Sequence, residues 1–326
     1  MKKYLTIFVC LLSALFFAAC QKQDTSVSKT GFYFDTVIKV TLYDADAEPE
    51  LESCFALADK YEKLLSATKK GSDIWNINHA NGQPVTVDSE TASLLQTALY
   101  WSEKTDGLID PTITPISQLW NFSGDPAGPV PKQSQINALL PHVDYHNIRI
   151  DGNTVTLADP DAQLDLGFLA KGAIADRLKA FFLQKNITSA LINLGGNVLA
   201  VGQKPDGTAF RTGIKKPFSE TNELVDIVAL KDQSLVSSGN YERCFRENGV
   251  LYHHILDPHT GYPADTGLSS VTILSDSSTD GDALSTSCFL LGYEKGRELI
   301  DSLPDIEALF VLSDGTTYRT EGFPQS

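Results

Sequence analysis

The chain has 326 residues, 42% of them hydrophobic and 21% charged, which is the composition of a globular protein with a sizeable core. The formal net charge is −15, and no run of lysines or arginines interrupts the acidic background. A nucleic-acid-binding protein needs a basic surface, so nucleic acid is set aside as a partner.

The first twenty residues have the pattern of a bacterial lipoprotein signal. Two lysines precede an apolar run that is too short for a comfortable transmembrane span, and the run ends in two alanines followed by Cys20. We expect a signal peptide over 1–19, lipidation of Cys20, a polar tether over 20–30 and one folded domain over 31–326. This predicts an extracytoplasmic protein held by lipid on a bacterial membrane. The alternative is an ordinary secretory signal cleaved at the same point.

After the predicted signal peptide and Cys20, the chain contains three cysteines, Cys54, Cys244 and Cys288, at unrelated spacings. An odd number without a repeated spacing indicates neither a disulfide framework nor a zinc site. We expect buried thiols, with one bridge left open as an alternative.

Hydrophobic patterning predicts strands and helices that do not alternate regularly. Helices are expected over 50–65, 88–107, 169–185 and 280–291, and strands over 32–43, 190–201, 210–215, 224–230, 268–274 and 308–312, with hairpins near 148–157 and 247–249. A doubly wound parallel sheet requires regular alternation. We therefore expect an α+β fold of mixed or antiparallel sheets with packed helices, as one domain with two lobes.

Residues 165–172 place a carboxylate, two glycines and Lys171 at the start of a predicted helix. Free N–H groups and the helix dipole favour a phosphate there, and the lysine adds a full charge. The same residues equally suit a tight strand-to-helix turn in which Asp165 is a cap and Lys171 is solvated.

Asp282 is followed by Ser285 and Thr286, three and four residues further on. If Asp282 opens a helix, all three side chains lie on one face, and such oxygen ligands suit a hard cation such as Mg²⁺. The alternative is a helix N-terminus with ordinary capping residues.

His253 and His254 begin a segment that contains two prolines and a glycine, which favours an ordered loop. Adjacent side chains on a strand point to opposite faces, so the two histidines cannot chelate one zinc ion. One of them is available to face a ligand. Two glycine-bearing segments, 193–197 and 237–243, would let a ligand approach the backbone, although a β-bulge explains each of them equally well.

Together these segments resemble the motifs of the ApbE family of flavin transferases, and they occur in the family's order. The matching segments are Gly107-Leu108-Ile109-Asp110-Pro111-Thr112, Asp165-Leu166-Gly167 with Ala170-Lys171-Gly172, Asn193-Leu194-Gly195-Gly196-Asn197, Ser238-Gly239-Asn240-Tyr241-Glu242-Arg243, His254-Ile255-Leu256-Asp257-Pro258 with Thr260-Gly261, and Asp282-Ala283-Leu284-Ser285-Thr286. The resemblance extends over nearly the whole chain that would follow the signal peptide.

The resemblance implies an enzyme that uses Mg²⁺ and FAD, transfers FMN to a threonine or serine hydroxyl of acceptor proteins and releases AMP. Subunits of membrane redox complexes are the expected acceptors. Hydrolysis of FAD to FMN and AMP is the alternative reaction. A lipoprotein that binds and stores FAD is the alternative of another class, and it would not need a metal at the pyrophosphate.

The resemblance also implies roles for individual residues. FAD would be bound by Phe34, Leu108, Ile109, Asp110, Asp165, Lys171, Gly195, Gly196, Ser238, Gly239 and Leu256. The metal would be bound by the carbonyl of Phe168 and by Asp282, Ser285 and Thr286. The catalytic candidates are Lys171, His254 and Asp257, and the general base is left open between His254 and a carboxylate. Phe168 replaces a usually small residue, and Phe34-Asp35-Thr36 replaces the family's Met-Gly-Thr.

Overall fold

The computed structural model describes residues 26–44 and 47–325. The predicted signal peptide, Cys20 and most of the predicted tether lie outside these residues. The part of the tether that is described differs from the prediction, because the first strand already begins at Val27. In the described part of the chain, no helix combines the length and the apolar character needed to cross a bilayer.

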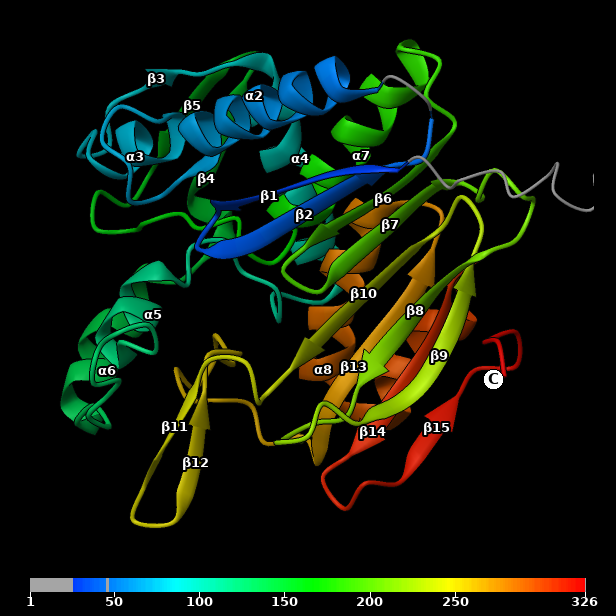
Figure 1. The fold of residues 1–326 in the computed structure, drawn as a ribbon. Coiled ribbons are helices and arrows are strands. Elements are labelled where there is room, and N and C mark those ends of the chain that lie inside the picture. The colour runs from blue at the N-terminus through cyan, green and yellow to red at the C-terminus, as the bar shows by residue number, and fades with distance from the viewer. Residues whose placement is uncertain (1–25, 45–46, 326) are drawn as a thin grey trace, which may run out of the picture.

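An eight-stranded sheet forms the centre of the fold (Figure 1), in the order β1-β2-β6-β7-β10-β13-β14-β15. All neighbouring pairs are antiparallel, which confirms the α+β prediction. The strands are β1 (Val27–Tyr33), β2 (Thr36–Leu42), β6 (Ser189–Leu194), β7 (Asn197–Gly202), β10 (Ser234–Gly239), β13 (Leu268–Ser275), β14 (Glu307–Leu312) and β15 (Thr317–Arg319).

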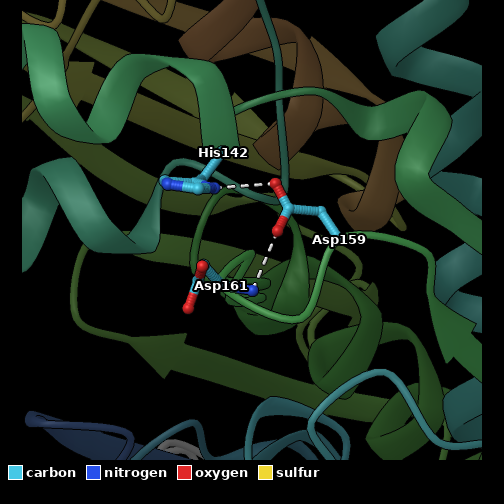
Figure 2. Close-up of side chains that lie close together, drawn as sticks. All are labelled: His142, Asp159 and Asp161. Atoms are coloured by element: carbon cyan, nitrogen blue, oxygen red, sulfur yellow. Dashed lines mark hydrogen bonds and ion pairs between the residues drawn. The ribbon is translucent and has the colours of Figure 1, made fainter.

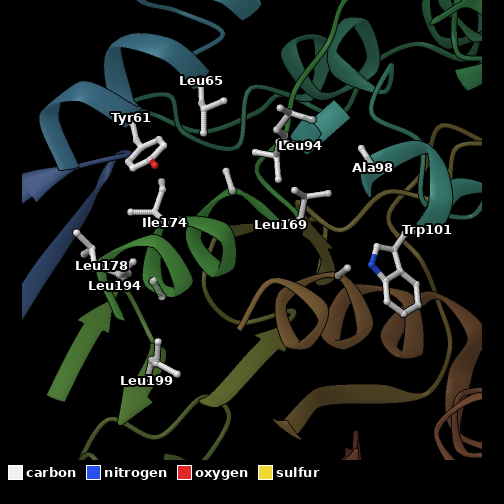
Figure 3. Close-up of a cluster of buried hydrophobic side chains, with 14 of the residues drawn as sticks. Tyr61, Leu65, Leu94, Ala98, Trp101, Leu169, Ile174, Leu178, Leu194 and Leu199 are labelled. Atoms are coloured by element: carbon white, nitrogen blue, oxygen red, sulfur yellow. The ribbon is translucent and has the colours of Figure 1, made fainter. Parts of the chain in front are cut away.

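Helices cover one face of this sheet. They are α2 (Glu48–Leu65), α4 (Ser89–Lys104), α7 (Ala170–Gln184) and α8 (Ser278–Asp301), with the short α3 (Asp73–Asn78) beside α2. Alternate side chains of the strands, such as Ile38 and Val40 of β2, are buried in this layer. Ile174 and Leu178 of α7 lie in its middle, between α2 and the sheet (Figure 3). Helix α7 therefore has a fixed place in the core, and its N-terminus is held with it.

Two smaller units complete the fold. The hairpin β8 (Phe210–Lys215) and β9 (Leu224–Leu230) covers the other face of the sheet. Helices α5 (Thr114–Trp120) and α6 (Gln133–Leu139) pack with the hairpin β11 (Cys244–Glu247) and β12 (Val250–His253) around the fully buried Trp120. This group of elements, here called the Trp120 lobe, projects beside the sheet in Figure 1. A three-stranded sheet of β3 (Val85–Thr86), β5 (Thr154–Leu157) and β4 (Ile148–Asp151) lies near α3.

The largest differences from the prediction are two strands that prove to be hairpins. The segment 32–43 turns at Phe34 and Asp35, both of which have positive φ, and 190–201 turns at Gly195-Gly196. Helix α8 also begins earlier than predicted and continues to Asp301 through a break at Gly292, whose φ is 77°. The three cysteines are free, and two of them are fully buried.

Candidate active site

The site is organised by close contact between the first turns of α7 and α8. A Cβ added to Gly172 would lie 2.8 Å from the Cα of Thr279 and against the carbonyl of Ser278, so only glycine allows the two backbones to meet here. Asp176 of α7 holds the other side of the contact, since its carboxylate accepts the backbone N–H groups of Ser278 and Thr279, each at 2.9 Å. The carboxylate thus caps α8 from a neighbouring helix.

Asp282 lies in this contact, inside its helix and not at the first helical position. Ser277 is the N-cap of α8, which places Asp282 one turn inside. The carboxylate is almost fully buried, accepts the N–H of Gly172 at 2.9 Å and lies 3.5 Å from Nζ of Lys171. Burial raises the pKa of Asp282, while Lys171 and the Gly172 N–H oppose that rise.

The same contact leaves a carbonyl at the start of α7 without its helical donor. The N–H of Gly172 would ordinarily close the first turn onto the carbonyl of Phe168, but it donates to Asp282 instead. The neighbouring carbonyl of Gly167 accepts from Nζ of Lys171 at 3.1 Å. Phe168 itself packs its ring partly against the main core. A larger residue is therefore tolerated at position 168, because the ring turns towards the core.

Three hydroxyls converge beside Asp282. The Ser238 hydroxyl on β10 lies 2.7 Å from that of Ser285 and 3.2 Å from that of Thr286, and Ser285 donates to the Asp282 carbonyl at 2.9 Å. Asp282, Ser285 and Thr286 lie within α8 at spacings of three and four residues, and so they share the expected face of that helix. Ser238 joins them from a different element.

His254 follows β12 at the base of the Trp120 lobe. Its Nδ1 is buried and has no hydrogen-bond partner in the described residues. Burial, helped by the positive charges of Arg243 and Lys171, lowers the pKa of His254 to about 3. The imidazole is therefore neutral at physiological pH. The neighbouring His253 faces a different environment, since its Nε2 lies 3.1 Å from the Ala264 carbonyl and its ring packs on Phe289.

The loop after His254 contains two further predicted site residues, Leu256 and Asp257, whose contacts in the structure are mainly structural. Leu256 is buried in the Trp120 lobe together with Ile116 and Ile136. The Asp257 carboxylate accepts the N–H of His259 at 2.9 Å and so stabilises the turn that follows it. No described contact joins Asp257 to the Asp282 cluster.

The hairpin tip at Phe34 is held by Glu62, a residue that no sequence motif marks as functional. The N–H of Phe34 donates at 2.8 Å to the carboxylate of Glu62 on α2, which also forms an ion pair with Lys69. Glu62 is 9% exposed, so this is a buried anchor for a strained turn. Beside the tip, the Gly195 N–H donates to the Val37 carbonyl at 3.2 Å, and the predicted cofactor residues Gly195 and Gly196 form the next turn.

Asp110 and Asp165 belong to one supported segment. Asp110 is buried, and its carboxylate accepts from the Thr112 N–H at 2.7 Å and the Tyr145 N–H at 2.9 Å, so its oxygens hold the loop together. The Asp165 N–H donates to the Pro111 carbonyl at 2.8 Å, and its carboxylate accepts the Gly167 N–H at 2.6 Å. Of the other candidates in these segments, Ile109 is buried in the main core, Leu108 packs against it, and Gly239 pairs with Ser270 of β13.

Two other features contain none of the predicted site residues. A cavity of about 260 Å³ between α2, α4, α7 and the first turn of α8 is lined by Tyr61, Glu90 and Arg177, among others. Figure 2 shows His142 with Asp159 and Asp161, whose possible ligand atoms lie within 4.8 Å of one another. The contacts among them are an ion pair of 2.7 Å and a turn hydrogen bond. These two contacts stabilise the loop after β5 and account for the closeness of the three side chains.

Comparison with known proteins identifies the class to which this architecture belongs. The sequence profile of the ApbE family matches residues 34–310. A FAD:protein FMN transferase of Treponema pallidum is 34% identical over 336 residues, covering 97% of this chain and 92% of its own. One from Klebsiella pneumoniae is 40% identical over 277 residues, covering 84% and 85%.

Solved structures agree with this assignment. The crystal structure of the ApbE protein from Thermotoga maritima matches with a TM-score of 0.84 at 32% identity, covering 91% of this chain and 97% of its own. The flavin transferase ApbE from Vibrio cholerae matches with a TM-score of 0.82 at 28% identity, covering 91% and 98%. The chain therefore belongs to the ApbE family, and the resemblance noted in the sequence is confirmed.

Proposed function

We propose that this protein transfers FMN from FAD to a threonine or serine hydroxyl of an acceptor protein and releases AMP. Its relatives named FAD:protein FMN transferase support the reaction over nearly the full chain. The observation in the structure that carries the proposal is the junction of α7 and α8, where Lys171, a buried carboxylate and three hydroxyls meet. A protein that only stored FAD would have no need of such a cluster.

The residues at this junction fit Mg²⁺. Asp282, Thr286 and Ser285 offer oxygen atoms, which are the ligands that this ion prefers, and the carbonyl of Phe168 has lost its helical donor to Asp282. A buried carboxylate whose pKa is raised by desolvation also gains from a nearby cation. We propose that these residues hold Mg²⁺, which when bound would neutralise charge on the pyrophosphate.

The protein's own groups would act as follows. Lys171, released from part of its pairing with Asp282, would bind a phosphate oxygen. The acceptor oxygen would attack the phosphorus of the FMN half, and the bond from that phosphorus to the bridging oxygen would break. AMP would leave with the bridging oxygen. His254, which is neutral, could take the proton that the acceptor hydroxyl loses.

We also propose the anchoring that the N-terminal sequence predicts. Lipidation of Cys20 would hold the domain on the outer side of a bacterial membrane, within reach of membrane redox proteins as acceptors. The strand that begins at Val27 leaves only a short connection between this anchor and the folded domain.

The test is mass spectrometry of candidate acceptors after incubation with the full protein, FAD and Mg²⁺. A threonine-containing acceptor should gain the mass of FMN less water, and the same acceptor with that threonine replaced by valine should gain none. AMP release should equal acceptor modification. If AMP and free FMN form at one rate with or without several native acceptors, the protein is an FAD pyrophosphatase.

A further inference from the structure

A second positive charge lies beside His254, on the side of the Trp120 lobe. Cys244 of β11 pairs with His253 of β12, and the N–H of His254 donates at 3.0 Å to the carbonyl of Arg243. Arg243 and His254 are therefore opposite each other at the base of the hairpin. Side chains that are opposite in an antiparallel ladder project from the same face.

The guanidinium of Arg243 remains free for a ligand. The residue is exposed, and its side chain forms no ion pair or hydrogen bond with the described residues. It is nonetheless close enough to depress the pKa of His254, as Lys171 also is. The imidazole, with its unpartnered Nδ1, thus lies in the field of two cations from different parts of the fold.

Lys171 and Arg243 differ in whether an acidic side chain neutralises their positive charge. Lys171 is paired with Asp282 and comes from the first turn of α7, whereas Arg243 has no acidic partner in the described residues and comes from the hairpin. An unbalanced guanidinium beside a neutral imidazole favours a ligand with negative charge, and its planar fork suits phosphate in particular.

We propose that Arg243 is a catalytic residue that binds the phosphate of the leaving AMP. This inference rests on the proposed function and extends it. Each phosphate of FAD carries one negative charge before transfer. Afterwards the FMN phosphodiester keeps one, while AMP becomes a monoester whose second pKa is about 6 and gains a further charge. The new charge therefore appears on AMP, and an exposed guanidinium can stabilise it and release it to solvent.

The experiment compares Arg243→Gln, Arg243→Lys and Arg246→Gln with the wild-type protein. Arg246 is a matched control, because it is an exposed arginine of the same hairpin whose Nη1 donates to the Gly249 carbonyl near the tip. Calorimetry with AMP and, separately, with FMN would measure affinity, and transfer to an acceptor would give kcat and KM for FAD.

Arg243→Gln should weaken AMP binding and lower kcat/KM by roughly 10- to 100-fold, the loss expected for a charge-assisted hydrogen bond. FMN affinity should change much less. Arg243→Lys should recover part of the loss, because it keeps the charge but not the fork. Arg246→Gln should behave as the wild type.

Equal AMP affinity in wild type and both Arg243 variants would overturn the assignment, as would equal losses for AMP and FMN. If Arg243→Gln does not fold, the Arg243→Lys protein decides by the same comparison of the two nucleotides. Failure of the proposed function would look different, since wild-type protein would bind AMP but modify no acceptor.

Discussion

The contact between α7 and α8 predicts that Gly172→Ala damages both stability and the site. The added methyl group would lie 2.6 Å from the carbonyl carbon of Ser278 and 2.8 Å from the Cα of Thr279, and neither backbone atom can move aside alone. Overpacking of this kind costs about 1–3 kcal/mol, and the better helix propensity of alanine returns at most about 1 kcal/mol. We expect a net loss of about 2 kcal/mol in the free energy of unfolding, at the upper end because backbone meets backbone.

Gly281→Ala is the matched control, since Gly281 is a helical glycine next to Asp282. Its added Cβ would meet only side-chain atoms, Ser275 Oγ at 2.9 Å and Val236 Cγ2 at 3.1 Å. We expect a change within about 1 kcal/mol for this variant. Urea unfolding at constant m-value measures both, and FAD affinity with Mg²⁺ reports the site, because Gly172→Ala also displaces the N–H bound to Asp282. Wild-type stability and FAD affinity in Gly172→Ala would refute the close contact.

Four further outcomes follow from the same geometry. Asp282→Ala should abolish FMN transfer but weaken FAD binding less, because charge neutralisation matters most as the pyrophosphate bond breaks. Full turnover of this variant, or of the wild-type protein in excess EDTA, would contradict the metal assignment. Glu62→Gln should keep the hydrogen bond to the Phe34 N–H and lower FAD affinity only slightly, whereas Glu62→Ala should lower FAD affinity several-fold. Titrations of flavin fluorescence measure both affinities. Equal FAD affinity in Glu62→Ala and the wild-type protein would show that Glu62 does not position the hairpin tip for FAD. His254 has a folded-state pKa of about 3, below the unfolded value of about 6.5, so the unfolded chain binds its proton first as pH falls. Stability should therefore decrease as pH falls through that window, and His254→Asn should flatten the slope in urea unfolding. Cys20→Ser should release the protein from membranes with its activity intact, and unchanged fractionation with membranes would disprove the lipid anchor.

Local signals predicted those elements whose ends are marked in the sequence. Asp88 caps α4, and the strands predicted over 210–215 and 224–230 have those bounds in the structure. The tight turn at Phe34-Asp35 is hard to predict because Phe34 is not one of the residues, glycine, asparagine or aspartate, that usually mark a positive φ. A buried hydrogen bond from Glu62, 28 residues away, supports that turn, and patterning within a short window cannot reveal it.

In the candidate site too, some features follow from local sequence and others depend on the tertiary fold. The common face of Asp282, Ser285 and Thr286 follows from helical spacing, which is a local property. The bond from Gly172 to Asp282 spans 110 residues and that from Ser238 to Ser285 spans 47, so both depend on the tertiary fold. The sequence predicts that Gly172 belongs to a phosphate-binding turn, and the structure adds that this glycine lets α8 pack against α7.

The geometry narrows the choice of general base that the sequence left open. The Asp257 carboxylate already accepts the N–H of His259 within its turn. Asp282 is buried against Lys171 and the Gly172 N–H, and we propose that its oxygens bind the cation. His254 remains, but in the free protein its low pKa makes it a weak base. Bound FAD would cancel the positive fields of Arg243 and Lys171 that help to lower this pKa, so the imidazole would become more basic only after the flavin nucleotide is in place. The same substrate that supplies the FMN would then prepare the base for the acceptor hydroxyl.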